Sequence, residues 1–323
     1  MLSAVEMFSG IGGWHMALSL LGRDLGVQIE RAFDTNLIAN TVYCENFGLQ
    51  PEPASLEKIA PERLSHAVWF LSPPCQPHTT AGKQLGAADS RSDALAHLVS
   101  LLPRARPKFV ILENVPPFET SSSCEQLIKA LEDINLNVVQ FQLSSTDFGT
   151  PNERKRYYLV ARERAFASSS TSEPLRSIPG SKYFDEHGKS RNDPKPIQAF
   201  LVEDEQTDLK PRKQLLRPGY KHDIVTPSSF SCSTFTKGYG HHTFGGPLLC
   251  TDNSIKPLRF YECGPDSPVR LFSSREIMSL MGFPKSFRFP PHTSEGQRRR
   301  LLGNSLNIEV AKEIIQFVFS EAA

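Results

Sequence analysis

Residues 2–21 combine a strand, a glycine-rich turn and a helix, and this order limits the fold more than any other feature. Residues 2–8 are mostly apolar and predict a short buried strand. Ser9-Gly10-Ile11-Gly12-Gly13 follows directly, and residues 14–21 carry the apolar pattern of a helix. A strand that feeds a helix through a glycine turn is typical of α/β folds, and it presents bare backbone amides to a ligand.

A second strand is predicted for residues 27–33, and it ends at Asp34. An acid about twenty residues after such a turn can accept hydrogen bonds from ribose hydroxyls. Asp34 could also cap the helix predicted for residues 37–47. The spacing favours a nucleoside-bearing cofactor. His15 replaces the third glycine of the dinucleotide fingerprint, which argues against a nicotinamide dehydrogenase.

A single cysteine lies between prolines after another apolar run. Residues 67–71 predict a buried strand, and Ser72-Pro73-Pro74-Cys75-Gln76-Pro77 follows. Proline donates no backbone hydrogen bond and fixes φ, so the strand must end here and the turn is stiff. Taken alone, Cys75 is compatible with a structural thiol in a proline-rich turn and with a nucleophile held at one angle.

Two further motifs carry charge next to predicted strands. The apolar run 108–112 predicts a strand buried on both faces, and Glu113 follows it. In a parallel sheet, Glu113 would emerge at the same edge as Cys75. Residues 152–156 form a basic patch beside two tyrosines, where alternate arginines can meet phosphate or a base.

The remaining periodicity completes an α/β pattern. Spacing of apolar residues predicts helices at 93–102, 125–134, 273–281 and 308–319, and strands at 54–59, 137–143 and 157–161. We expect Pro103 to end the first of these helices. We expect the glycine-containing loop 81–92 to act as a mobile flap over the site.

Composition narrows the function classes. The 36 Lys and Arg against 35 Asp and Glu leave a near-neutral chain of 323 residues, so a polyanion would have to bind at a local patch. The six cysteines include no CxxC pair, which predicts neither a zinc site nor a disulfide framework and favours a reducing, intracellular compartment. The sequence shows no signal-peptide pattern and no run of membrane-spanning length, so we expect no membrane partner.

The character of the sequence changes after about residue 165. A serine-rich tract at 168–172 is typical of a linker, and proline, glycine, lysine and histidine are frequent up to Pro265. This part predicts a second, irregular domain. Its basic segments at 210–217 and 237–242 interleave positive charge with aromatic residues, which suits an unstacked nucleic acid.

Taken together, the motifs resemble those of the cytosine-5 methyltransferases along almost the whole chain. The matching motifs are Phe8–Gly13, Ser72–Pro77, Glu113–Val115, Arg154 with Arg156, Arg270–Glu276 and Gly303–Ser305. The resemblance implies a Rossmann-like class I S-adenosylmethionine-dependent methyltransferase fold with a smaller inserted target-recognition domain. The implied catalytic domain comprises residues 1–164 and 270–323, and the implied target-recognition domain comprises residues 165–269.

The resemblance also implies the roles of individual residues. Cys75 would add as a thiolate to C6 of cytosine, and Glu113, protonated through a raised carboxyl pKa, would hydrogen-bond N3 and the exocyclic amine. Arg154 and Arg156 would hold the base carbonyl and the backbone, and Arg156 could also steady Cys75 or Glu113. The implied cofactor contacts are Phe8, Ser9, Gly10, Ile11, Gly12, Gly13, Asp34, Ser55, Leu56, Ser72, Asn304 and Ser305. The implied nucleic-acid contacts are Lys237, Tyr239 and His241.

Within this family, the segment Phe235–Gly240 is similar to the small branch that methylates cytosine 38 in the anticodon loop of tRNA-Asp. We therefore expect a monomeric tRNA (cytosine-5) methyltransferase of the cytoplasm and nucleus, which converts S-adenosyl-L-methionine to S-adenosyl-L-homocysteine. Two positions depart from the pattern. Ser55 stands where the family has an acid, and Thr234 stands where the branch has a cysteine, with Cys232 two residues earlier. A DNA (cytosine-5) methyltransferase and a non-catalytic nucleic-acid-binding homologue are the alternatives.

Overall fold

Two compact units make up the chain in the computed structural model. Unit 1 consists of residues 1–143, 155–190 and 310–323, and unit 2 consists of residues 144–154 and 191–309. The functional division expected from the sequence, 1–164 with 270–323 against 165–269, stays a prediction. The structure describes residues 1–74, 93–166, 173–202, 211, 221–242, 245–250, 252, 258–262 and 267–320.

A six-stranded sheet in the order β2-β1-β3-β4-β6-β5 forms the centre of unit 1. β2, β1, β3 and β4 pair in parallel, and β6 runs antiparallel to β4. A largely parallel sheet with helices on both faces is the predicted Rossmann-like α/β class. The strands are β1 (Leu2–Met7), β2 (Val27–Phe33), β3 (Val68–Leu71), β4 (Phe109–Asn114), β5 (Asn137–Ser144) and β6 (Lys155–Arg162).

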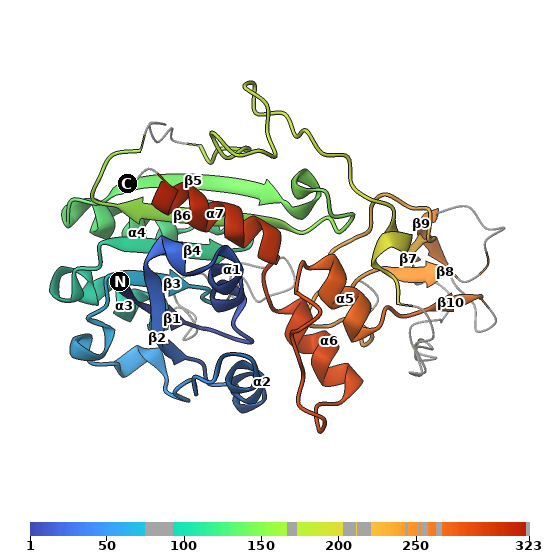
Figure 1. Cartoon of the computed structure of the whole chain (residues 1–323), viewed down its shortest axis with the longest axis horizontal. Helices are drawn as coiled ribbons and strands as arrows, with labels where there is room; N and C mark the ends of the chain where they lie inside the picture. The colour runs from blue at the N-terminus through green and yellow to red at the C-terminus, as the bar shows by residue number, and fades with distance from the viewer. Residues whose placement is uncertain are drawn as a thin grey trace. The chain divides into compact units, whose positions relative to one another are not determined.

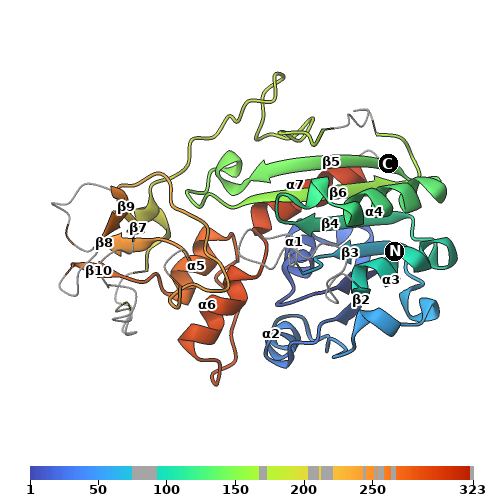
Figure 2. The ribbon, with the colours of Figure 1, turned by 180° about the vertical axis from the view of Figure 1, so that it is seen from behind.

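Helices cover both faces of this sheet. α1 (Gly13–Leu21) and α7 (Ile308–Ser320) lie on the face toward the viewer in Figure 1. α3 (Asp93–Ala105) and α4 (Ser122–Asp133) lie on the opposite face, which Figure 2 turns to the front. α2 (Leu37–Phe47) follows β2. None of the helices in the described part of the chain is long and apolar enough to cross a membrane.

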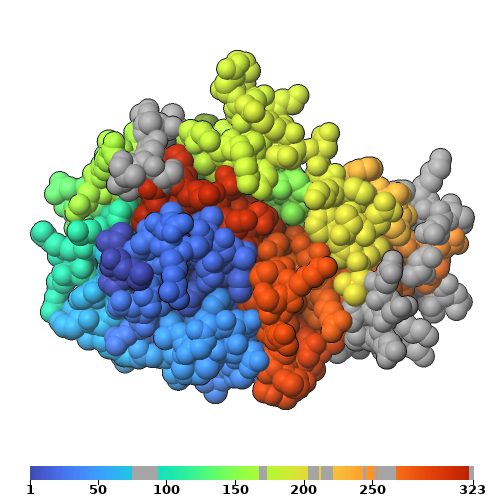
Figure 3. Space-filling view, in the orientation of Figure 1, coloured from blue at the N-terminus to red at the C-terminus, as the bar shows by residue number. Residues whose placement is uncertain are grey.

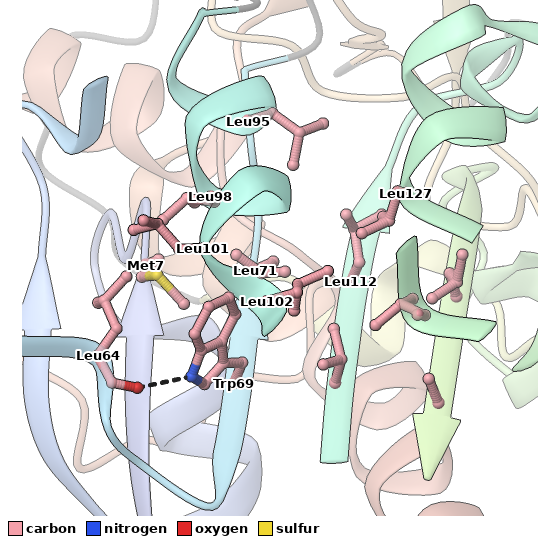
Figure 4. Close-up of a cluster of buried hydrophobic side chains, with 14 of the residues drawn as sticks. Met7, Leu64, Trp69, Leu71, Leu95, Leu98, Leu101, Leu102, Leu112 and Leu127 are labelled. Atoms are coloured by element: carbon pink, nitrogen blue, oxygen red, sulfur yellow. Dashed lines mark hydrogen bonds between the residues drawn. The ribbon is translucent and has the colours of Figure 1, made fainter. Parts of the chain in front are cut away.

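The side chains of the sheet divide between two cores, because successive residues of a strand face opposite sides. On the side of α3 and α4, Trp69, Leu71 and Leu112 pack among leucines of both helices (Figure 4). The indole N–H of Trp69 donates to the carbonyl of Leu64 at 2.9 Å. The largest buried ring on this face is therefore both packed and hydrogen-bonded, as a buried indole requires.

On the opposite face, Trp14 of α1 packs against the sheet. Its ring centroid lies 5.6 Å from that of Phe70 and 6.3 Å from that of Tyr158. Glu6 points to the same face as Ala4 by the alternation of β1, and both are buried. An acid thus lies under the first helix, where an apolar residue would be expected.

After β6 the chain crosses the surface of unit 1 before it enters unit 2. Residues 173–190 form the yellow-green band that stands out in Figure 3. The hydroxyl of Ser181 donates to Oε2 of Glu313 on α7 at 2.6 Å. Leu175 exchanges backbone hydrogen bonds with β5, so both contacts fix this band to unit 1.

Unit 2 contains a four-stranded sheet in the order β10-β8-β7-β9, together with α5 (Ser274–Leu280) and α6 (Glu295–Gly303). Its core contains Phe235, whose ring meets those of Tyr239 and Phe272 edge-on at 5.0 and 5.3 Å. The strands are β7 (Lys221–Val225), β8 (Leu248–Cys250), β9 (Leu258–Glu262) and β10 (Val269–Arg270).

Most predicted elements are confirmed within a few residues, but two predictions were wrong and one helix was missed. Residues 54–59 hold a 3-10 turn, Leu56–Lys58, instead of a strand, because the Ser55 hydroxyl caps the backbone N–H of Glu57. α3 continues through Pro103 to Ala105, since a proline near a helix end sacrifices only one backbone bond. α6 was not predicted.

Three further expectations concern residues outside the described part of the chain. These are the flap at 81–92, the serine-rich linker at 168–172 and most of the basic segment at 210–217.

Candidate active site

The glycine turn is held against the end of β2. The backbone N–H of Gly10 donates to Oδ2 of Asp34 at 2.7 Å, and the N–H of Ser9 donates to the carbonyl of Phe33 at 3.0 Å. Gly10 and Gly12 have φ angles of 52° and 83°, in the left-handed region that favours glycine. Two predicted cofactor segments, the turn and Asp34, therefore meet at one edge of the sheet.

Asp34 does not cap α2, which excludes one of the two roles that the sequence left open, and its contact with a cofactor stays a prediction. The side chain of Asn36 is the cap, because it accepts the backbone N–H groups of Ile38 and Ala39. Oδ1 of Asp34 accepts the backbone N–H of Asn36 at 2.8 Å. Burial raises the pKa of Asp34 above its usual value, and the two backbone hydrogen bonds act in the opposite direction. A carboxylate has lone pairs for further donors such as ribose hydroxyls.

Beneath the turn, Glu6 lies at the N-terminus of α1 with only 1% of its surface exposed. Its Oε1 accepts the backbone N–H of Trp14 at 3.2 Å, and its Oε2 accepts the hydroxyl of Tyr43 at 2.8 Å. The same hydroxyl lies 2.8 Å from Nδ1 of His15, whose ring stacks on Phe47 at 4.0 Å. Burial raises the pKa of Glu6 to about 8 and lowers that of His15 to about 4.

This network links β1, α1 and α2 around the glycine turn, so it positions the turn. The sequence analysis did not single out Glu6, although an acid inside an apolar strand before a glycine turn was a usable signal.

The buried carboxyl predicts a specific dependence of stability on pH. Glu6 ionises near 4.5 in the unfolded chain and near 8 in the folded chain. Between these values the folded chain keeps the proton on Glu6 that the unfolded chain has lost, so the contribution of Glu6 to stability falls as pH rises, by about 1.4 kcal/mol per unit. We expect Glu6→Gln to remove this slope. The free energy of unfolding of the variant should therefore rise relative to that of the wild type with each pH unit toward pH 8.

Urea denaturation between about pH 5 and pH 8, followed by tryptophan fluorescence, measures the difference. Both tryptophans, Trp14 and Trp69, lie in unit 1. The exposed Glu57→Gln is the matched control, and its difference from the wild type should not vary with pH. A Glu6→Gln difference that is equally flat would contradict the prediction.

The proline-cysteine motif begins beside the first helix. The indole N–H of Trp14 donates to Oγ of Ser72 at 3.0 Å, and the N–H of Ser72 donates to the carbonyl of Met7 at 3.2 Å. β3 and β4 are parallel, with Leu71 opposite Leu112. Residues 72–74 and Glu113 therefore lie at the same edge of the sheet. Cys75, Gln76 and Pro77 lie outside the described residues.

Glu113 and Arg156 form an ion pair. Nε of Arg156 lies 3.2 Å from Oε1 of Glu113, and each side chain is only 13% exposed. The antiparallel pairing of β4 with β6 sets Glu113 opposite Tyr158, so Arg156 reaches the carboxylate from two residues earlier in β6. A neighbouring guanidinium favours the charged form of a carboxylate, so this ion pair opposes the protonated Glu113 that the resemblance implies.

Arg154 belongs to unit 2, and its side chain binds backbone carbonyls of that unit. It is 4% exposed, and its guanidinium donates to the carbonyl of Phe235 at 3.0 Å and to those of Gly303 and Ser305. These bonds hold the segment 303–305, including the predicted cofactor residue Asn304, to the chain around Phe235. Arg154 therefore positions this segment within its unit, and its contact with the base stays a prediction.

The residues predicted to contact nucleic acid differ in their exposure to solvent. Lys237 and His241 are exposed, as a surface contact requires. Tyr239 is 3% exposed, and its hydroxyl donates to the carbonyl of Pro247 at 2.9 Å while accepting the N–H of Phe272 at 2.7 Å. Tyr239 is a core residue, and its ring is not available for stacking on a base, which corrects that prediction.

The other predicted cofactor residues also differ in exposure. Ser55 is exposed, whereas Leu56 is 4% exposed and belongs to the core of unit 1. Asn304 is exposed and Ser305 half-buried directly after α6 in unit 2. Phe8 is half-buried against the core of unit 1, and Ile11 is buried.

Comparison with known proteins identifies the family of the chain. The signature of C-5 cytosine-specific DNA methylases matches residues 2–320. The chain is 32% identical to the tRNA (cytosine(38)-C(5))-methyltransferase of Homo sapiens, over 98% of this chain and 99% of that protein. It is 29% identical to the DNA (cytosine-5)-methyltransferase of Dictyostelium discoideum, over 99% of this chain and 94% of that protein. The crystal structure of the S. pombe Dnmt2 methyltransferase matches with a TM-score of 0.82 at 29% identity, over 100% of this chain and 99% of that chain. With a family match that spans nearly the whole sequence, the chain belongs to the C-5 cytosine-specific DNA methylases.

Proposed function

We propose that this protein methylates C5 of cytosine 38 in tRNA, with tRNA-Asp as the favoured substrate and S-adenosylmethionine as the methyl donor. Family membership gives the reaction, and the human relative named for cytosine 38 of tRNA is similar along its whole length. The observation that carries the catalytic part is the shielded pair of Glu113 and Arg156 at the sheet edge where residues 72–74 also end.

The cofactor that the family implies fits the residues of unit 1. Oγ of Ser9 is buried and has no hydrogen-bond partner within the described ranges, so it can serve a ligand. The glycine turn offers backbone amides, and Asp34 and Ser72 offer oxygen atoms beside it. Asp34 would hold the ribose hydroxyls. When bound, S-adenosylmethionine supplies an electrophilic methyl group on a sulfonium.

The residues of the chain would make C5 of cytosine nucleophilic. The thiolate of Cys75 adds to C6, and the electron pair of the C5–C6 bond moves into the ring as the S–C6 bond forms. Glu113 gives a proton to N3 and neutralises the charge that develops there. Because Arg156 favours ionised Glu113, we infer that its guanidinium turns to the base carbonyl when cytosine enters, which lets the carboxyl carry that proton.

The second half of the reaction restores the enzyme. Once C5 carries the methyl group, a base removes the C5 proton and the electron pair re-forms the C5–C6 bond. The S–C6 bond breaks, the thiolate of Cys75 leaves, and the N3 proton returns to Glu113. The target cytosine must leave its stack, and a loop base does so at lower cost than a paired one.

Labelled methyl transfer to an unmodified tRNA-Asp transcript and to duplex DNA, measured side by side, tests the proposal. We expect transfer to the transcript, loss of transfer when cytosine 38 is replaced by uridine, and loss with Cys75→Ala. The similarity to a relative named as a DNA methyltransferase makes DNA the second candidate. Preference for DNA would overturn the substrate, and no transfer to either would support a non-catalytic homologue.

A further inference from the structure

One aromatic ring stands exposed on unit 2. The side chain of Phe230 is 59% exposed, and it is the one aromatic among the exposed large hydrophobic residues of the described chain. An isolated apolar residue on a surface needs no explanation by itself. A function for the ring therefore requires support from the residues around Phe230.

The backbone before Phe230 is fixed by a hydrogen-bonded turn. Ser229 is 8% exposed, and its hydroxyl accepts the backbone N–H of Thr226 at 2.9 Å. The carbonyl of Ser229 accepts the backbone N–H of Ile197 at 2.9 Å. The backbone on the N-terminal side of Phe230 is therefore held in place by two hydrogen bonds of Ser229.

The backbone after Phe230 is paired with the segment that carries Arg154. Cys232 is fully buried, and its N–H donates to the carbonyl of Pro151 at 2.7 Å while its carbonyl accepts the N–H of Glu153 at 2.8 Å. Glu153 directly precedes Arg154, which braces the segment 303–305 as described above. The exposed ring is thus held in fixed register with a family motif in the same unit.

The ring also borders a cavity. The cavity has a volume of about 240 Å³ and lies between the end of β7 and the loop that follows it. This is below the roughly 300–1,000 Å³ of pockets for drug-sized ligands, so it suits a single planar ring better than a whole cofactor. Serine hydroxyls and a carboxylate supply both donors and acceptors. The lining residues are Asp223, Ile224, Val225, Ser228, Ser229, Phe230 and Ser231.

The charge of the surrounding segment favours a polyanion. Within residues 221–242 the exposed charged side chains are Lys221 and Lys237, and the one acid of the segment, Asp223, is 8% exposed. Proteins that bind unpaired nucleic acid combine aromatic rings for the bases with positive charge for the phosphates, and this segment carries both on its surface. A protein partner would not require this bias of charge.

We propose that Phe230 stacks on one unpaired base of the RNA substrate, other than the target cytosine, and that the adjoining cavity receives the edge of that base. The inference rests on the proposed function, because it requires an RNA with an unpaired loop. It makes Phe230 a determinant of substrate choice that neither the sequence motifs nor the family signature singles out.

The test compares Phe230→Ala, Phe230→Tyr and the matched control Leu20→Ala, which removes an exposed apolar side chain from unit 1. The substrate is an anticodon stem-loop RNA that contains cytosine 38. We expect Phe230→Ala to raise KM by about 5- to 150-fold with little change in kcat, as the loss of one base–aromatic stack implies. Phe230→Tyr should restore KM, and Leu20→Ala should not change it.

A second measurement does not depend on activity. 5-Iodouridine is placed at one unpaired loop position at a time, and the irradiated complex is digested and sequenced. One position should cross-link to the peptide that contains Phe230, and the cross-link should vanish in Phe230→Ala. Wild-type methylation of RNA with an unchanged KM for Phe230→Ala, or cross-links only to other peptides, overturns the inference and leaves the proposed function standing. Absence of wild-type methylation overturns the proposed function, and the inference with it.

Discussion

Replacement of Glu113 by glutamine should lower kcat by about 10²- to 10⁴-fold while RNA and cofactor affinities change by less than about tenfold. Glutamine keeps the shape of the side chain and can still hydrogen-bond a base, but it cannot give a proton to N3. The loss should therefore fall on the chemical step. Single-turnover methylation of a tRNA transcript measures it, together with equilibrium binding of RNA and cofactor.

Two further variants distinguish an effect on catalysis from an effect on folding. Glu125→Gln changes an exposed acid in the first turn of α4 and should leave kcat unchanged. Arg156→Lys keeps the positive charge near Glu113 but loses the planar fork of the guanidinium, so a smaller fall in kcat is expected. If Glu113→Gln raised KM and left kcat intact, the carboxyl would be a binding group and the proposed proton transfer would be wrong.

The sequence predicted those parts of the fold that local chemistry determines. Strand ends are visible because prolines follow Ser72 and glycines follow Phe8, and the helix at 37–47 has the predicted bounds. The edge where residues 72–74 and Glu113 both emerge followed from the parallel order alone. Each strand end has its signal within a few residues, and the shared edge needs only the parallel order of the strands.

The remaining features depend on partners far away in the chain. An Arg-x-Arg pattern is the same whether Arg154 faces a base or, as found, binds the carbonyls of Gly303 and Ser305. An aromatic residue in a basic segment suggests stacking, but Phe272, more than thirty residues later, makes Tyr239 a core residue. Phe230 carries no motif at all, so only its exposure reveals it.

Charged helices and buried acids escape sequence analysis for a different reason. α6 has no clear apolar face, and its one signal was the capping box of Ser294 and Gln297. Glu6 interrupts a strand that is mostly apolar, and alternation shows which face it occupies but not that α1 begins over it. Both features required the tertiary neighbours to be known.

The largest effect on stability is expected at the glycine turn, where two neighbouring glycines offer an internal comparison. A Cβ at Gly12 would lie 2.3 Å from Cε2 of Phe47 and 2.9 Å from the ring of Tyr43, whereas a Cβ at Gly10 would meet nothing within 4 Å. Both residues have positive φ, at 83° and 52°. Alanine at either position is therefore destabilised by its left-handed backbone conformation, and only alanine in place of Gly12 is also destabilised by overpacking.

We expect Gly10→Ala to lower the free energy of unfolding of unit 1 by about 1–2 kcal/mol. For Gly12→Ala we expect about 2–5 kcal/mol, the backbone penalty plus about 1–3 kcal/mol for overpacking. Urea denaturation followed by tryptophan fluorescence reports on unit 1, since Trp14 and Trp69 both lie there. Gly12→Ala should also weaken cofactor binding in calorimetry more than Gly10→Ala, because relief of the clash must move Phe47 or the turn itself.

Equal losses of stability in the two variants would mean that the ring of Phe47 yields without cost, and that the turn is less tightly packed than its contacts indicate. A second substitution then distinguishes strain from packing. Phe47→Leu removes the atom that the new Cβ would meet, so it should recover part of the loss in Gly12→Ala and none of the loss in Gly10→Ala. Because Phe47 also stacks on His15 at 4.0 Å, the double variant is compared with Phe47→Leu alone. The coupling between positions 12 and 47 then measures how far packing beneath the turn fixes the proposed cofactor site.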